Sequence, residues 1–215
     1  MEFSSFLSRV QAFPVVDTRV LSTMGSNSLS LKVQISRWVK SKKLIQLKRG
    51  LYLLAEPYRK ISPSEFYIAG VLKNPSYISL EKALEYHGLI PEAVTVYTCV
   101  TTKGPESFKT PFGRYDYSHV KPSLFWGYIS LNMNGQTVFM AAPEKALLDF
   151  FYLKHVKVSL DYLKEMRLQN VENIKLKKLL EYARRFKKKN LMPTAQLVGQ
   201  YIKDEMFGRR GVKKL

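Results

Sequence analysis

Residues 28–54 constrain the fold more than any other stretch, because a helical pattern runs directly into a basic hairpin pattern. Leu31, Ile35, Trp38 and Val39 recur at intervals that place them on one face of a helix over residues 28–42. The opposite face carries small polar and cationic residues together with one valine: Ser30, Lys32, Val33, Ser36, Arg37 and Lys40. This pattern predicts a helix that buries one side and exposes a cationic side.

Two short apolar runs follow this helix and are joined by Lys48, Arg49 and Gly50. Glycine adopts positive φ without a side-chain clash, so Gly50 favours a tight hairpin turn. Before the helix, residues 2–12 form an amphipathic pattern, and Asp17 is suited to cap a second helix over residues 18–24. The order of three helices and a hairpin predicts a winged helix-turn-helix. In that fold a helix enters the major groove of DNA and the hairpin meets phosphates.

The net charge of +18 is concentrated at the two ends of the chain. Residues 1–60 hold 11 Lys and Arg against 3 Asp and Glu, residues 61–155 hold 8 against 8, and residues 156–215 hold 16 against 6. Two basic ends around a neutral middle favour patches that bind nucleic acid, although solvated charged faces are the simpler alternative. A hydrophobic fraction of 46% excludes a disordered polyelectrolyte.

Cysteine usage and hydropathy indicate the compartment. Cys99 is the single cysteine, which favours a reducing environment because no internal disulfide can form. The first residues lack the basic start and long apolar run of a signal peptide, and no stretch approaches the roughly 20 apolar residues that span a bilayer. We therefore expect a cytoplasmic protein that does not contact membranes.

Two prolines within residues 57–63 mark a linker between two domains. We expect a winged helix-turn-helix domain over residues 1–58 and an α+β domain over residues 62–215, with a basic helical region over residues 156–215. The α+β prediction rests on alternating helical and strand patterns. Helices are expected over residues 63–72, 80–87, 143–154, 159–169, 172–189 and 193–207. Strands are expected over residues 94–101, 113–120, 125–131 and 138–140, with a hairpin turn at Asn134 and Gly135.

Several motifs in this order resemble the AbiEi family of antitoxins from abortive-infection toxin–antitoxin systems. They are PSYISLEKALEYHGLIPE (residues 75–92), residues 100–102, TPFGRYDY (110–117), FWGY (125–128) and APEKALLDFFY (142–152). The run WVKSKKLIQLKRGLY (38–52) is similar to the end of that family's winged helix and its wing. The resemblance covers about residues 17–153 and leaves the basic C-terminal region without a motif.

The resemblance implies a transcriptional autorepressor that is also an antitoxin. Such proteins repress their own promoter at inverted repeats of double-stranded DNA, and a C-terminal α/β domain counteracts a nucleotidyltransferase-type toxin. That antagonism does not always require a tight complex, so the toxin or its RNA target is the implied partner.

The candidate DNA contacts fall into two groups. On the helix, Lys32, Gln34 and Arg37 could contact base edges, and Val33 could contact a thymine methyl group. At the hairpin tip, Lys48 and Arg49 are better placed for phosphates. The complete candidate set is Ser30, Lys32, Val33, Gln34, Arg37, Lys40, Lys48 and Arg49. An ordinary solvated helix face is the alternative for each residue.

A second nucleic-acid patch is predicted on a basic amphipathic helix near the C-terminus. It comprises Lys175, Lys178, Arg184, Arg185 and Lys188. Such a helix can also lie on an anionic membrane, but its apolar stripe is needed for folding, which favours DNA or RNA as the polyanion.

No pattern predicts catalysis, a cofactor or a metal ion. Glu144 and Lys145 are adjacent at a helix start, whereas a nuclease strand motif needs one residue between the two, so Glu144 is expected to complement the helix dipole. The three histidines have no partners at metal-ligand spacing. We therefore expect no enzyme activity. A winged-helix regulator with a ligand- or partner-sensing second domain remains the main alternative, ahead of a nucleic-acid enzyme.

Overall fold

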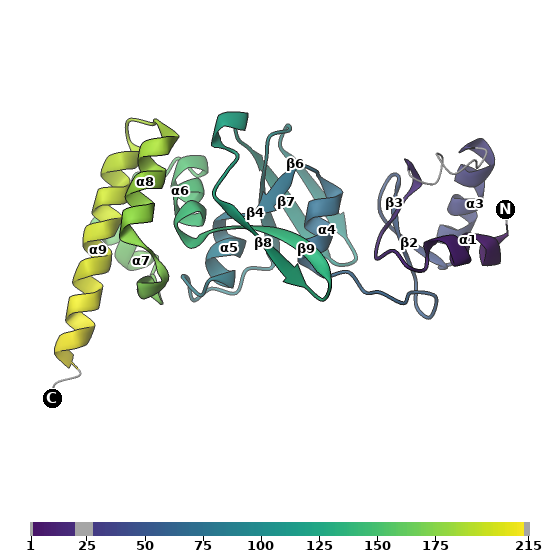
Figure 1. The fold of residues 1–215 in the computed structure, drawn as a ribbon, viewed down its shortest axis with the longest axis horizontal. Helices are drawn as coiled ribbons and strands as arrows, with labels where there is room; N and C mark the ends of the chain where they lie inside the picture. Colours follow the sequence, from purple (N-terminus) through teal and green to yellow (C-terminus); the bar gives the residue numbers. More distant parts are fainter. Residues whose placement is uncertain (1, 20–27, 213–215) are drawn as a thin grey trace.

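The computed structural model describes residues 2–19 and 28–212, which form an elongated α+β molecule (Figure 1). A small N-terminal unit lies at one end, a six-stranded sheet lies in the middle, and helices from the C-terminal third lie at the other end. The expected α+β fold is confirmed. Within the described residues, no helix combines the length and apolar character needed to cross a membrane.

The N-terminal unit has a three-stranded antiparallel sheet in the order β1-β3-β2. Its elements are α1 (Phe3–Val10), β1 (Val16–Asp17), α3 (Ser28–Lys40), β2 (Leu44–Lys48) and β3 (Leu51–Leu54). The helical and hairpin patterns therefore predicted α1, α3, β2 and β3 to within a few residues, whereas the two-residue strand β1 was not predicted. The helices pack their apolar stripes against the sheet because burial of those side chains drives their association.

The connection between β1 and α3 begins as the capping pattern predicted. The backbone N–H of Arg19 donates to Oδ1 of Asp17 at 2.9 Å, and residues 18–19 are helical. Gly50 has φ of +88°, and its carbonyl accepts the backbone N–H of Thr18 at 3.0 Å. The hairpin turn is thus attached to the start of this connection. The rest of the second helix, expected to reach residue 24, lies outside the described residues.

The central sheet has the order β6-β7-β5-β4-β9-β8 and is mixed. The pairs β4–β9 and β5–β7 are parallel, and the other three pairs are antiparallel. Asn134 and Gly135 both have positive φ, as the predicted tight turn between β8 and β9 requires. The strands are β4 (Ser76–Ile78), β5 (Val96–Thr101), β6 (Glu106–Thr110), β7 (Gly113–His119), β8 (Tyr128–Met133) and β9 (Gln136–Ala141).

Two of these strands were not expected. The strand β4 has only three residues, all buried, and such a run has no alternation to detect. The strand β6 is a largely exposed edge strand with the polar sequence ESFKT, and its pairing with β7 defines it. Both strands depend on tertiary contacts rather than on local pattern.

Helices surround the sheet and form the C-terminal end. They are α4 (Glu65–Leu72), α5 (Leu80–Tyr86), α6 (Pro143–Leu153), α7 (Leu160–Glu165), α8 (Leu176–Phe186) and α9 (Leu191–Val212), with short 3-10 turns η1 (Pro122–Leu124) and η2 (Val171–Asn173). The helix α4 starts later than expected because Ser64 caps it, accepting the N–H of Tyr67 at 3.2 Å. The α7 region is shorter than expected, and α9 is longer.

Two hydrophobic clusters share the β2–β3 hairpin. The smaller cluster lies in the N-terminal unit and includes Leu44 and Leu54, whereas Leu47, Leu51 and Leu53 belong to the large cluster of the second part. The strand β2 also contacts β6 of the central sheet. The predicted linker thus connects two parts whose packing continues through the hairpin.

Candidate nucleic-acid interface

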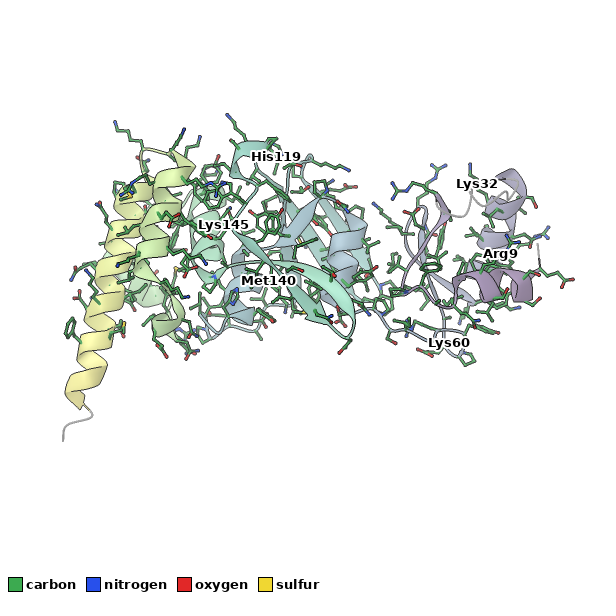
Figure 2. The ribbon with its side chains drawn as sticks, in the orientation of Figure 1. Arg9, Lys32, Lys60, His119, Met140 and Lys145 are labelled. Atoms are coloured by element: carbon green, nitrogen blue, oxygen red, sulfur yellow. The ribbon has the colours of Figure 1, made fainter. Side chains whose placement is uncertain are left out.

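The outward face of α3 gathers most of the DNA-contact candidates. Ser30, Lys32, Arg37 and Lys40 are exposed, and Val33 keeps 51% of its surface exposed. The buried face beneath them fixes the helix, because Leu31, Ile35 and Trp38 are nearly fully covered. Figure 2 shows Lys32 at the end of the molecule farthest from α9. Gln34 is half-buried at the border of this face.

Aromatic packing holds this helix in place. The Trp38 ring lies 4.6 Å from the Phe6 ring and 5.3 Å from the Phe3 ring, measured between centroids. Aromatic pairs at such distances add specific stabilisation beyond area burial. The helix therefore presents its outer side chains from a rigid support, as a surface that reads another molecule requires.

The cations of this face have no counter-charge among the described residues. Within the described residues, Lys32, Arg37 and Lys40 form no ion pair and no side-chain hydrogen bond. A patch of unpaired cations attracts polyanions and releases their counterions on binding. The α3 face is defined here as the exposed side chains of Ser30, Lys32, Val33, Arg37 and Lys40.

The hairpin tip differs from the sequence expectation. Lys48 was expected to contact phosphate, but its ammonium donates a hydrogen bond to the carbonyl of Leu72 and lies 5.2 Å from the Phe108 ring centroid. Its partial burial lowers its pKa. Lys48 thus docks the hairpin onto α4 and β6, and its ammonium is directed to the second part of the protein. Arg49 is exposed and remains a phosphate candidate.

In the structure, some cations of the predicted C-terminal patch are exposed, whereas others contact protein groups. Lys175 and Arg184 are exposed. By contrast, the ammonium of Lys178 lies 3.1 Å from Oε2 of Glu144, and the guanidinium of Arg185 lies 4.2 Å from the Trp126 ring centroid. Lys178 and Arg185 therefore already contact protein groups, and they are less free than Lys175 and Arg184 to bind nucleic acid.

Lys188 belongs to a cavity that the sequence did not predict. It lines a volume of about 400 Å³ at the start of α9, together with His155, Lys189 and Asn190, and its ammonium lies 5.6 Å from the Tyr152 ring centroid. The walls come from the end of α6 and from the turn between α8 and α9. Residues more than thirty positions apart in the sequence form it, so no local motif marks it.

Glu144 fits its expected role as a first-turn acid and also makes a specific contact. Its Oε1 accepts the backbone N–H of Lys175 at 2.9 Å, which ties the start of α8 to the start of α6. Its neighbour Lys145 was not singled out as buried, yet its side chain has no exposed surface. A helix-start lysine is ordinarily solvated, so this burial has a tertiary cause.

That cause is a buried polar cluster, defined as Lys145, Asp149, Tyr77 and Ser79. The ammonium of Lys145 pairs with Asp149 and donates to the Tyr77 hydroxyl at 2.9 Å. The hydroxyls of Tyr77 and Ser79 each donate to Oδ2 of Asp149 at 2.9 Å. Burial lowers the pKa of Lys145 and raises that of Asp149, and each group's opposite charge counteracts this effect.

Aromatic rings enclose this cluster. The Lys145 ammonium lies 4.7 Å from the Phe186 ring centroid and 5.0 Å from that of Trp126. Because the ammonium and the carboxylate are sealed from solvent, they do not contact an external substrate in this arrangement. Their contacts instead join α6 to β4, and they fix the position of the Tyr77 ring.

The remaining chemical candidates occupy structural positions. Cys99 is fully buried, which raises the pKa of its thiol. His87 contacts the carbonyl of Ala141 at 2.7 Å, and His119 contacts that of Lys103 at 3.0 Å. In the part of the chain that the structure describes, no group of three or more His, Cys, Asp or Glu residues is arranged to hold a metal ion.

Two sequence comparisons with known proteins found no match. No protein-family model matches this chain, and no curated protein is significantly similar to it in sequence. The resemblance to AbiEi antitoxins therefore stays a prediction that rests on the sequence motifs.

Proposed function

We propose that this protein binds double-stranded DNA through the α3 face, with its N-terminal unit acting as a winged helix-turn-helix. The observation that carries the proposal is the unpaired cationic surface of α3, supported from below by a tightly packed tryptophan. The element order α1, β1, α3, β2, β3 and the sheet order β1-β3-β2 also support it, since α3 leads directly into an antiparallel hairpin, as the wing of a winged helix-turn-helix requires.

The side chains of α3 have different proposed roles. Arg37 and Lys32 contact base edges in the major groove, with Arg37 suited to two hydrogen bonds with guanine. Val33 contacts a thymine methyl group, because an exposed valine at this point offers an apolar surface. Arg49 contacts phosphate from the hairpin turn. Lys48 is not part of this proposal because it is bound to the second part of the protein.

The biological role proposed for this DNA binding is autorepression by an antitoxin. Its support is the series of AbiEi-like motifs over residues 38–152, most of which lie outside the N-terminal unit. The second part of the chain would then counteract a nucleotidyltransferase-type toxin, by contact with the toxin or with its RNA target. A cytoplasmic location follows from this role.

A salt titration of binding tests the DNA proposal. Fluorescence anisotropy would compare operator and random duplexes for the full-length protein and three variants. Arg49→Ala should weaken both duplexes and flatten the slope of log K against log salt by about 0.9. Arg37→Ala should cost about 1–3 kcal/mol on the operator and little on random DNA. Lys203→Ala, an exposed α9 control, should change neither duplex. Equal losses on both duplexes for Arg37→Ala would assign that residue to phosphate.

The antitoxin role needs a separate test. Full-length protein carrying Arg37→Ala would be co-expressed, in a growth assay, with the nucleotidyltransferase that a neighbouring gene is proposed to encode. We expect this variant to lose promoter repression and to keep rescuing growth, because its change lies only on the α3 face. Loss of rescue by a folded Arg37→Ala protein would place the antitoxin activity in the DNA-binding face. An absent neighbouring nucleotidyltransferase gene would favour a ligand-sensing regulator.

A further inference from the structure

A cavity of about 370 Å³ lies where the N-terminal unit meets the second part of the chain. Asp17 and Arg19 line it from the end of β1, and α4, β4 and the β8–β9 hairpin provide the other walls. Cavities of about 300–1,000 Å³ with a few placed polar groups are typical of small-molecule sites. Nothing in the proposed DNA or antitoxin roles uses this cavity.

One wall of the cavity is aromatic. The rings of Tyr77 and Tyr128 are stacked, with centroids 4.9 Å apart and planes inclined by 23°. Phe125 lies 5.1 Å from Tyr77, and Phe139, which is 44% exposed, lies 5.6 Å from Tyr128. All four rings line the cavity. Tyr77 itself is buried, so Tyr128 and Phe139 supply the accessible ring faces of this wall, and such faces bind planar rings by stacking.

The buried polar cluster makes this wall rigid. The Tyr77 hydroxyl donates to Asp149 and accepts from Lys145, both at 2.9 Å, so its ring cannot rotate away without breaking buried hydrogen bonds. A wall fixed before the ligand arrives loses less conformational freedom on binding. The buried pair of Lys145 and Asp149 thus positions a ring beside the cavity. This role is distinct from stabilising the protein and from binding DNA.

Three polar side chains beside the aromatic wall have no hydrogen-bond partner among residues 2–19 and 28–212. Ser76 is 94% buried and lines the cavity, and its hydroxyl makes no hydrogen bond within the described residues. The side chains of Asn74 and Thr137 also line the cavity and make no hydrogen bond in the described part of the chain. An amide and two hydroxyls supply donors and acceptors, the groups that recognise the edge of a heterocycle.

The charge of the lining indicates a neutral ligand. Among the described lining residues, only Asp17 and Arg19 are charged, and they form an ion pair at 2.5 Å. Their charges balance, so the described lining carries no net positive charge to attract a phosphate group. A neutral planar molecule with hydrogen-bonding edges matches these walls better than a nucleotide or an aliphatic metabolite.

We propose that this cavity binds a nucleobase or a nucleoside. The ring packs against Tyr128 and Phe139, the accessible rings of this wall, with the buried Tyr77 ring behind Tyr128, and its edge meets Asn74, Ser76 and Thr137. The proposal stands without DNA binding. Because the cavity includes the end of β1, an occupied cavity also connects the unit that carries α3 to the central sheet. Any effect of the ligand on operator affinity rests on the proposed DNA-binding function.

Thermal shift and calorimetry on the full-length protein without DNA test the proposal. The probes are adenosine, guanosine, cytidine and uridine, with ribose and benzyl alcohol as controls for the sugar and for a simple ring. We expect at least one nucleoside to raise the melting temperature and to bind more tightly than both controls by at least tenfold. No binding by any nucleoside, or equal binding of a control, would overturn the proposal.

Two glycines provide a matched pair of variants. A Cβ built at Gly70, which lines the cavity from α4, meets no atom within 4 Å, and the same is true at Gly104 in an exposed turn. Gly70→Leu should occupy part of the cavity and reduce nucleoside affinity at least tenfold, whereas Gly104→Leu should leave it unchanged. Wild-type affinity in Gly70→Leu would refute the location of the site.

A variant that removes one polar group from the cavity keeps the test informative if Gly70→Leu does not fold. Thr137 is exposed on β9, so Thr137→Val removes a hydroxyl without disturbing the core. We expect it to weaken the best nucleoside several-fold and to leave benzyl alcohol binding unchanged. Unaltered nucleoside affinity in both Thr137→Val and Asn74→Ala would contradict the proposed hydrogen bonds between these side chains and the edge of the base. Operator binding by these variants reports separately on the α3 face.

Discussion

The ion pair between Lys145 and Asp149 offers a measurable test of how the second part is stabilised. Neither side chain has exposed surface. Asp149→Asn keeps the size of the side chain and one oxygen for the hydroxyls of Tyr77 and Ser79, but it leaves the ammonium without a counter-charge. Breaking a buried pair in this way costs about 3–5 kcal/mol. For a chain of this length, 1 kcal/mol corresponds to about 2–4 °C, so the melting temperature should fall by about 6–20 °C.

The double variant Lys145→Met with Asp149→Asn separates the pair from its individual residues. Methionine retains most of the lysine stem, so packing between the rings of Trp126 and Phe186 is preserved. With both charges gone, no uncompensated charge remains, and we expect the double variant to be more stable than Asp149→Asn alone by about 2 kcal/mol or more.

Urea unfolding followed by circular dichroism measures these differences. The control is Asp161→Asn, because Asp161 pairs with Lys164 at 4.0 Å while both side chains are largely exposed, and this change should leave the midpoint where it is. If Asp149→Asn shifts the midpoint no more than Asp161→Asn does, the pair is not desolvated in the folded protein. The argument that it fixes the Tyr77 ring would then fail as well.

Two further predictions use matched positions. Gly127 and Gly135 have φ of +78° and +77°, but a Cβ at Gly127 would lie 3.0 Å from Cγ of the buried lysine, whereas one at Gly135 meets no atom within 4 Å. In urea unfolding, alanine at either position should cost about 1–2 kcal/mol in backbone strain, and alanine at Gly127 should cost about 1–3 kcal/mol more; equal losses would contradict the steric argument. Arg185→Ala should lower stability by about 0.5–1 kcal/mol because its guanidinium lies 4.2 Å from an indole centroid, while Arg184→Ala, also exposed on α8, should have a smaller effect in the same assay.

The sequence predicted features that local pattern determines. The stripe of Leu31, Ile35 and Trp38 identified the buried face of α3. The residues on the opposite side of the helix were correctly expected to be exposed. Asn134 with Gly135 identified the β8–β9 turn, because positive φ at two consecutive positions requires such residues. In each case the deciding interactions lie within a few residues of one another.

Features that depend on distant contacts were not predictable in this way. Lys48 has the same charge and hairpin context as its neighbour Arg49, and only the position of the Leu72 carbonyl distinguishes them. Lys145 is enclosed because Asp149 lies one helical turn away and because rings from η1–β8 and α8 close over it. The aromatic cavity likewise combines α4, three strands and the end of β1. None of these arrangements has a local signature.

The shared hairpin has a consequence for how such proteins can change over time. Leu44 and Leu54 belong to one hydrophobic cluster, while Leu47, Leu51 and Leu53 belong to the other. A recombination event that exchanged residues 1–60 for another DNA-binding unit would remove these three leucines from the large cluster. The new unit would have to supply side chains that fit against β6 and α4. Changes in DNA specificity are therefore expected through point substitutions on the outer side of α3, which contributes nothing to either cluster.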